Sequence, residues 1–300
     1  MRKIPIEGTI LAAYRFCFGN IISIIGTMWF PMLVFVAVLG GFAYAIIPHE
    51  WLSGHFVAPA DPQAFVLSRL PLFALAIPLV MVAGLLVSAM IRVGILRLAL
   101  EEKPRLTLIW FSLDGRVWRM IGATVLVFVF FIICEIAAGV TFGAANFVLS
   151  SLVKAPQVVA VLANVGLVAV AFVAVIYVMA RLFFFLPAVI VGEHRLSLER
   201  AWALGEGNVL RIIVVLLGVV FPIYILAVIA IYATVIPTVL VQVIRLQPNN
   251  ASDAMAFLTS LWPLIPVIIG IELVAGVLLS GTVFGAIGAA YKAVTTPADG

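Results

Sequence analysis

The chain has 300 residues, of which 65% are hydrophobic and only 10% are charged, and its formal net charge is +4. A soluble domain typically has about 45–50% apolar and about 25% charged residues, so the composition excludes an ordinary soluble protein. The positive charge does not indicate nucleic-acid binding, because the basic residues lie between apolar runs, where they mark membrane topology. We therefore expect a membrane protein whose partners do not include nucleic acid.

Six apolar runs each reach the length of about 20 residues that spans the hydrocarbon of a bilayer. In chain order they are about Ile21–Ile47, Leu70–Leu100, Trp118–Leu149, Val158–Val191, Val209–Val243 and Trp262–Ala290. Several are longer than the minimum, which predicts tilted or kinked helices or ends that leave the bilayer. The sequence thus predicts an all-α integral membrane protein with six transmembrane helices, forming a single polytopic domain over residues 1–300.

Basic residues alternate between the connections that join these runs. The N-terminal segment and the second and fourth connections hold most of them, whereas the other three connections hold one each, Arg69, Lys154 and Arg245. Segments rich in Lys and Arg stay in the cytosol. The pattern therefore predicts that both termini are cytosolic.

A short pattern occurs twice, each time just before an apolar run. The first copy is Thr9-Ile10-x-x-Ala13-Tyr14-x4-Gly19-Asn20 and the second is Ser197-Leu198-x-x-Ala201-Trp202-x4-Gly207-Asn208. We expect the first residue of each copy to N-cap a short helix and the asparagine to N-cap the following span. The glycine should end the short helix in the left-handed conformation. The aromatic ring should lie at the membrane interface.

A third, weaker copy lies between these two. It keeps Leu106, Trp110, Gly115, Val117 and Ile121 in register, with Arg116 in place of the asparagine. The three copies predict three parallel repeat units, at about residues 4–96, 97–192 and 193–295. Each unit would be an interfacial helix followed by a membrane hairpin, which predicts two or three interfacial helices on the cytosolic side.

Two stretches around the second copy, Pro187–Val191 and Leu196–Asn208, are the most distinctive in the chain. They resemble the membrane domain attached to some bacterial glycerophosphodiester phosphodiesterases and the stand-alone YciC-like inner-membrane proteins. The resemblance is specific over about Arg181–Ile213 and implies a multi-pass protein of the bacterial inner membrane. It does not imply phosphodiesterase activity, because that reaction belongs to a separate soluble barrel domain for which this chain has no room. The pair His194-Arg195 echoes a His-Arg pair of those enzymes, but Leu196 follows where they have Gly.

Two glutamates, Glu135 and Glu272, lie inside predicted spans. Intramembrane carboxylates are costly and are functional candidates by default. Each shares a helical stripe with small residues, and such stripes are where membrane helices approach closely, so we expect both to face protein. One interpretation is a proton- or cation-coupled pathway. The other is structural: each glutamate is neutral, or bonded to a Tyr, Ser, Thr or Asn of a neighbouring helix.

Arg92 and Arg181 lie within the predicted cytosolic ends of the second and fourth spans. Arginine near a helix end usually extends to the headgroups, which is the structural interpretation. The alternative is a binding site for lipid phosphate, which Arg97 and Lys103 would complete. The partners that the sequence predicts are membrane lipids and either a membrane-protein partner or a second copy.

Small residues of the last span form a ladder, Gly281, Gly285 and Ala289. We expect it to pack against another span of the same chain, with a homodimer interface as the alternative. Cys17 and Cys134 fall in or beside apolar segments and predict packing rather than a disulfide.

No motif identifies a reaction, and we predict neither an enzyme nor a metal or cofactor site. The leading interpretation is a non-enzymatic protein that acts through lipid or protein contacts, as an envelope-maintenance protein or accessory subunit. The alternative is a small secondary transporter or channel that uses Glu135 and Glu272.

Overall fold

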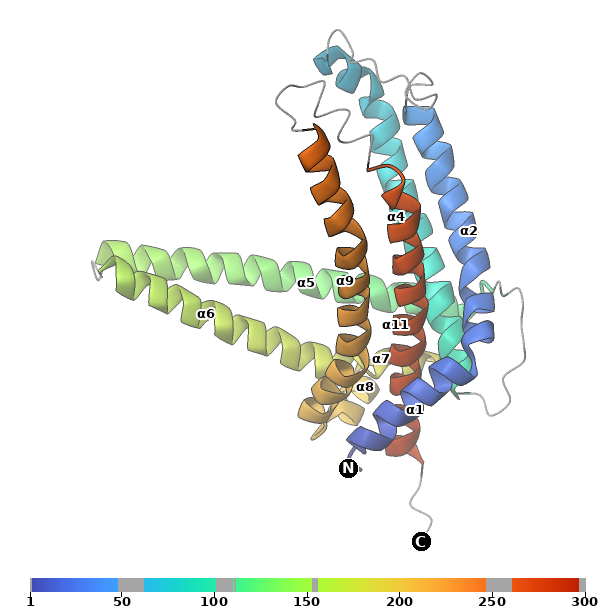
Figure 1. Cartoon of the computed structure of the whole chain (residues 1–300). Coiled ribbons are helices and arrows are strands. Elements are labelled where there is room, and N and C mark those ends of the chain that lie inside the picture. The colour runs from blue at the N-terminus through green and yellow to red at the C-terminus, as the bar shows by residue number, and fades with distance from the viewer. Residues whose placement is uncertain are drawn as a thin grey trace. The chain divides into compact units, whose positions relative to one another are not determined.

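The computed structural model describes residues 2–47, 62–100, 110, 112–152, 156–246 and 261–296. These residues form α1 (Ile6–Gly19), α2 (Ile21–Ile46), α4 (Pro62–Leu100), α5 (Gly115–Phe147), η1 (Val148–Leu152), α6 (Gln157–Val178), η2 (Met179–Phe183), α7 (Leu186–Gly192), α8 (Leu198–Gly205), α9 (Val209–Leu246) and α11 (Leu264–Thr295) (Figure 1). All the elements are α-helices except η1 and η2, which are short π-helices. Within the described part of the chain, this confirms the all-α prediction.

Six helical stretches are long and apolar enough to cross a membrane. They are Ile21–Ile46, Leu67–Leu100, Gly115–Phe147, Gln157–Gly192, Val209–Val241 and Leu264–Thr295. Each corresponds to one of the six apolar runs, and the ends differ by a few residues. The prediction of six candidate spans is therefore confirmed.

Contacts divide the chain into two compact units. The first covers Gly26–Val209, and the second combines Arg2–Ile25 with Leu210–Gly300. This division is made by contact and does not follow the bounds of the proposed repeat, which stays a prediction. Each unit is described on its own.

In the first unit, the core lies where α4, α5 and α7 meet. Five of the seven residues of α7 are buried, and Pro187 lies in its first turn, where a missing N–H costs nothing. Val93, Ile95 and Leu96 of α4 and Val117 of α5 are also fully buried. The core is thus concentrated at the end of α4 and the beginning of α5.

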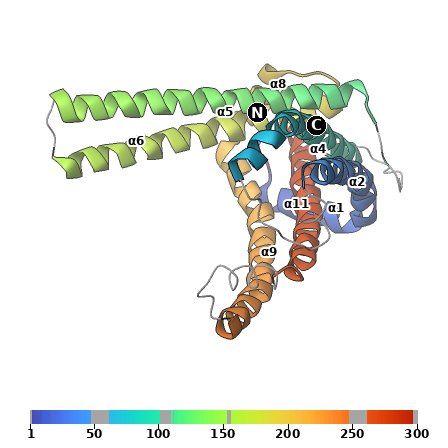
Figure 2. The same cartoon turned by 90° about the horizontal axis from the view of Figure 1, so that it is seen from above.

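Further along, α5 and α6 run antiparallel and lie side by side in both views (Figures 1 and 2). Asn164 Nδ2 donates to Asn146 Oδ1 at 2.8 Å, which links the two helices. Otherwise this hairpin is covered little by the chain, because no residue in the most apolar window of either span is buried.

In the second unit, α1 packs on α11 more extensively than on any other described element. A Cβ placed on Gly281 would lie 2.7 Å from Cys17 Sγ, and one on Gly285 would lie 2.8 Å from Phe16 Cδ1. The Cβ on Gly281 would also meet Ile24 of α2 at 2.9 Å, so this part of the ladder packs against α1 and the start of a candidate span of the same chain. Cys17 is fully buried there, which confirms its packing role. A homodimer interface stays a prediction.

A second contact holds α1 against α9. The Tyr14 hydroxyl donates to the Gly218 carbonyl at 3.0 Å. In an unbroken helix that carbonyl would accept from the N–H four residues on, but that residue is Pro222, inside α9, and proline has no N–H. Tyr14 therefore satisfies the backbone acceptor that Pro222 leaves open.

Both ends of α1 differ from the prediction for the first motif copy. Thr9 is not the N-cap, because α1 starts at Ile6 after Pro5, and the Thr9 hydroxyl donates back to the Pro5 carbonyl at 2.7 Å. Gly19 is also not left-handed, since Gly207 is the described glycine with a positive φ. Asn20 instead donates from Nδ2 and from its backbone N–H to the Phe16 carbonyl, each at 3.0 Å. The asparagine side chain thus closes α1.

The second copy follows the prediction more closely. Ser197 is the N-cap of α8, and its Oγ accepts from the Arg200 N–H at 3.3 Å. Gly207 has φ +70°, the left-handed conformation that favours glycine. Asn208 is buried, and its Nδ2 donates to the Glu206 carbonyl at 3.4 Å.

The beginning of the third copy, with Leu106, lies outside the described residues, whereas Trp110 and the start of α5 at Gly115 are described. Asp114 is its N-cap, and its Oδ1 accepts from the N–H groups of Arg116 and Val117 at 3.1 and 3.2 Å. Here the side-chain cap of the span comes from the residue before the glycine.

Candidate functional site

Arg181 is enclosed by groups of its own unit. It lies in the π-helical segment η2, and such bulges often occur at functional sites. Its guanidinium carbon lies 4.1 Å from the centre of the Trp202 ring, and Nη1 donates to Tyr177 Oη at 2.7 Å. Glu206 lies 3.8 Å from Nη2, and the Arg181 side chain is 16% exposed. This set of residues is called the Arg181 clamp below.

The clamp depends on Gly205. A Cβ on Gly205 would overlap the Arg181 carbonyl oxygen, so that α8 and η2 can approach this closely only with glycine at this position. Gly205, Trp202 and Glu206 all belong to the second motif copy or lie within it. The second copy therefore provides the ring, the carboxylate and the close approach that hold one arginine.

The other basic residues of the predicted phosphate site are less fully defined. Arg92 is half-buried, and its Nη1 donates to Thr124 Oγ1 at 3.3 Å across α4 and α5. Arg97 is also half-buried, and Lys103 lies outside the described residues. The structure thus gives Arg92 and Arg181 protein partners, and a phosphate site built from these four residues stays a prediction.

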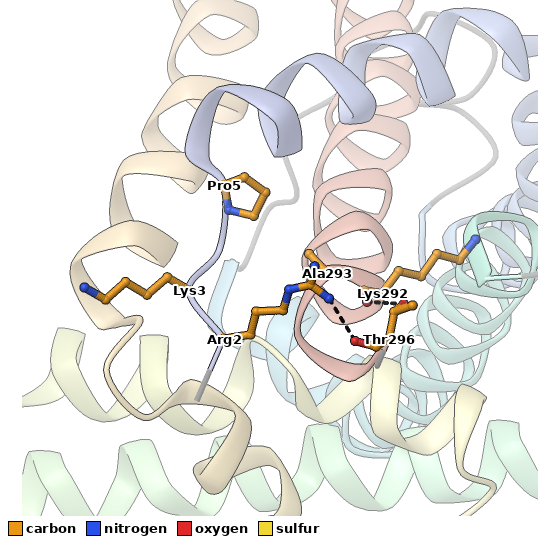
Figure 3. A pocket seen from close by; sticks show the side chains of 6 residues that line it. All are labelled: Arg2, Lys3, Pro5, Lys292, Ala293 and Thr296. Atoms are coloured by element: carbon orange, nitrogen blue, oxygen red, sulfur yellow. Dashed lines mark hydrogen bonds between the residues drawn. The ribbon is translucent and has the colours of Figure 1, made fainter. Parts of the chain in front are cut away.

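A different basic cavity forms at one end of the second unit. It has a volume of about 500 Å³ and is lined by Arg2, Lys3, Pro5, Lys292, Ala293 and Thr296. Arg2 Nη1 donates to the Thr296 carbonyl at 3.0 Å, which ties the N-terminal segment to the end of α11. Figure 3 shows the Lys3 and Lys292 side chains extending away on opposite sides of Arg2. Among the described residues, three basic side chains and no acidic one line the cavity.

The N-terminal segment is held at a second point. Arg211 Nη1 donates to the Ile4 carbonyl at 2.7 Å, and Ile4 is fully buried. Lys3 lies next to this anchored residue and Arg2 is bonded to Thr296. Residues from opposite ends of the sequence are thus fixed around one cavity.

Glu135 lies on α5 and is exposed. It makes no hydrogen bond or ion pair with any residue that the structure describes, and a Cβ on Gly139 or Gly143 of the same stripe would meet nothing within 4 Å. Among the described residues of the first unit, no protein neighbour covers this stripe, and the expectation that it faces protein stays a prediction. Glu135 and Glu272 belong to different units, and each is considered on its own.

Glu272 lies on α11 and lines a cleft of about 260 Å³ with residues of α9. The lining residues are Tyr224, Ala227, Val228, Ile231, Tyr232, Glu272, Ala275 and Leu279. Glu272 also lacks a hydrogen bond or ion pair to the described part of the chain. A bond to a hydroxyl or amide of a neighbouring helix, one of the two forms of the structural interpretation, is therefore absent among these residues. The other form, a neutral glutamate, stays a prediction.

Sequence reasoning missed several of these residues. Arg2 and Lys3 indicated only the orientation of the chain, and Lys292 is the single basic residue after Arg245, so little in the sequence signalled a basic site. Tyr224 and Tyr232 are eight residues apart, a spacing that places both on one side of a helix. Nothing in the sequence connected them with Glu272, because that pairing depends on how α9 and α11 pack.

Comparison with protein-family models, with curated proteins and with solved structures finds no match to this chain. The resemblance around Arg181–Ile213 therefore stays an expectation from sequence.

Proposed function

We propose that the chain is a non-enzymatic protein of the bacterial inner membrane, with both termini cytosolic, that acts by binding anionic lipid headgroups. It would serve as an envelope-maintenance protein or accessory subunit. The observation that carries the proposal is the basic cavity around Arg2, Lys3 and Lys292.

Electrostatics support this proposal. The cytosolic leaflet is negatively charged, and each Lys or Arg near its surface contributes about 1 kcal/mol of attraction. The cavity has three such residues at the end of a candidate span, and none of its described lining residues is acidic. The positive-inside pattern would place this end of the second unit at the cytosolic surface. A headgroup phosphate is the anion available there.

We further propose that α1 and α8 lie in the headgroup region and are copies of one repeated unit. Each is a short helix just before a candidate span, and the two copies have related residues at the six positions of the pattern. Phe18 and Leu11 of α1 are more than half exposed, as expected for side chains that face lipid.

Native mass spectrometry tests the lipid proposal. The full chain is purified from mixed phosphatidylglycerol and phosphatidylethanolamine bilayers, and the lipids that remain bound are identified. Lys3→Gln/Lys292→Gln removes two charges of the cavity while leaving the Arg2 hydrogen bond in place. We expect it to lower retained phosphatidylglycerol roughly tenfold or more, since about 2 kcal/mol of attraction is lost.

The matched control is Arg15→Gln/Arg119→Gln, which removes two exposed positive charges outside the cavity. It should retain nearly as much phosphatidylglycerol as the wild type. An equal loss in both variants would show a general surface attraction and overturn the cavity as the site. No preference for phosphatidylglycerol in the wild type would overturn the lipid proposal itself.

A second candidate, a small secondary transporter or channel, is favoured by one observation, the unpaired Glu272 carboxylate in a cleft. Reconstituted vesicles would show a proton or cation flux that Glu272→Gln abolishes. Glu135→Gln is the matched variant, and it lines neither the cleft nor the basic cavity. Equal fluxes in wild type and Glu272→Gln would remove this candidate.

A further inference from the structure

We infer that the cleft between α9 and α11 is a binding site for a small, lipophilic organic ammonium ion, with Glu272 as its counter-ion. This inference depends neither on anionic-lipid binding nor on transport. It is built from four features of the cleft: its carboxylate, its rings, its apolar lining and its size.

The carboxylate comes first. Glu272 lies within the candidate span Leu264–Thr295, roughly 12 Å from the Leu264 end at about 1.5 Å per residue. No described residue pairs with it. A bare charge at such a position is costly, and side chains of this kind normally pair with another charge or face a cavity. A cation bound in the cleft would provide the missing partner.

The two tyrosines favour an organic cation. Tyr224 and Tyr232 line the cleft from α9, opposite Glu272 on α11. The two helices run antiparallel in Figure 1, and both tyrosines line the same cleft as the carboxylate. Aromatic faces with a carboxylate are the chemistry that recognises alkylated ammonium groups.

The remaining lining argues against an inorganic ion. Ala227, Val228, Ile231, Ala275 and Leu279 supply only carbon atoms from their side chains. Metal cations of the Ca²⁺ type need six or more oxygen ligands, and the side chains of this cleft offer one carboxylate and two phenol hydroxyls. Methyl groups on an ammonium nitrogen, in contrast, fit an apolar wall.

Size and access define the class of ligand. The volume of about 260 Å³ is just below the roughly 300–1,000 Å³ of sites for drug-sized molecules, which favours a small ligand. Tyr224 and Tyr232 are 59% and 58% exposed. The cleft is thus open at its side within a candidate span, where a cation that partitions into lipid can enter.

The test uses trimethylphenylammonium as the probe and tert-butylbenzene as its neutral analogue, in which carbon replaces the nitrogen. Binding of each to the full chain in nanodiscs is measured by calorimetry, with empty nanodiscs to correct for partition into lipid. Glu272 is exposed in the cleft. The wild type should therefore bind the cation roughly fivefold more tightly than the neutral analogue, since an exposed charge pair contributes up to about 1 kcal/mol.

Four substitutions localise the effect. Glu272→Gln should remove the preference for the cation, whereas Glu135→Gln, the same change in the other intramembrane glutamate, should leave it intact. Tyr232→Leu should weaken binding of the cation by about 2- to 30-fold. Tyr232→Phe keeps the ring and should weaken binding by less than about twofold.

Two outcomes would overturn the inference. One is equal binding of the cation and its neutral analogue by the wild type. The other is unchanged cation binding in Glu272→Gln. Thermal unfolding of each variant in the same nanodiscs checks that it folds. If Glu272→Gln does not fold, the wild-type preference together with the Tyr232→Leu and Tyr232→Phe pair decides the matter.

Discussion

The two copies of the Ala-aromatic-x4-Gly-Asn pattern have related sequences but pack by opposite arrangements. Cys17 of the first copy and Gly205 of the second are at equivalent positions in the pattern, and both are buried. In the first, α1 brings the cysteine and its neighbour α11 supplies the glycine, Gly281. In the second, α8 itself supplies the glycine, and its neighbour η2 brings a backbone carbonyl. The pattern thus places a close helix contact at this position, and either of the two helices can supply the small residue.

The aromatic residues at equivalent positions differ in the same way. Tyr14 donates its hydroxyl to the Gly218 carbonyl that Pro222 leaves without a donor. Trp202 covers the guanidinium of Arg181 with its ring. Each side chain thus stabilises a different polar group of an apolar helix. Tyr14 satisfies a backbone acceptor, and Trp202 covers a buried charge. The two copies therefore have an aromatic residue at the same position, but the interaction that its side chain makes depends on the neighbouring helix.

The largest difference between the copies should appear on adding one methyl group to Gly205. In Gly205→Ala the new Cβ meets the Arg181 carbonyl oxygen and lies 3.0 Å from Arg181 Cα, and backbone cannot rotate away. We expect a loss of about 3 kcal/mol in the free energy of unfolding, from overpacking. Chemical denaturation in detergent measures it, and Gly139→Ala, where a Cβ meets nothing within 4 Å, is the control.

The mirror-image change in the first copy is Gly281→Ala. Its Cβ would lie 2.7 Å from Cys17 Sγ, which a second substitution can remove, and 2.9 Å from Ile24 Cδ1, the end of a side chain that can rotate away. Cys17→Ala/Gly281→Ala should therefore recover most of the stability lost in Gly281→Ala. Failure of this rescue, or a Gly205→Ala variant as stable as the wild type, would contradict the proposed exchange of large and small partners.

The next effect concerns the hydroxyl of Tyr14. Tyr14→Phe leaves the Gly218 carbonyl with no donor, which should lower the free energy of unfolding by about 2 kcal/mol. In a Pro222→Ala background the backbone N–H returns to that carbonyl, and the same substitution should then cost less than about 0.5 kcal/mol. A double-mutant cycle measures the coupling. Additive effects would show that Tyr14 does not replace the missing N–H.

The same contact predicts a pH dependence. Burial raises the pKa of Tyr14, and the nearby Cys17 raises it further. Because the folded pKa lies above the usual value of about 10, the contribution of Tyr14 is fully present below pH 10 and is lost as the pH rises through the folded value. Burial raises the pKa of Cys17 as well. The wild type should therefore lose more stability at alkaline pH than Tyr14→Phe does.

Sequence could predict the six candidate spans because long apolar runs are a local property. It could also predict Ser197 as an N-cap and Gly207 as left-handed, since both depend on a few adjacent residues. It was wrong about Thr9, because Pro5 four residues earlier already starts the helix. The cleft at Glu272 and the cavity at Arg2 could not be predicted, because each joins residues from separate helices whose packing no local pattern records.

The smallest expected difference in the free energy of unfolding is between substitutions of the two glycines that precede the asparagines. Gly207 has φ +70°. Because a residue with a Cβ is strained in this left-handed conformation, Gly207→Ala should lower the free energy of unfolding by about 1 kcal/mol. Gly19 is the last residue of α1, has no positive φ and has open space around it. Gly19→Ala should therefore be neutral or up to about 0.5 kcal/mol stabilising. The same chemical denaturation compares them. Equal costs would mean that the two copies end their helices in the same way, and a larger cost at Gly19 would reverse the assignment of the left-handed corner.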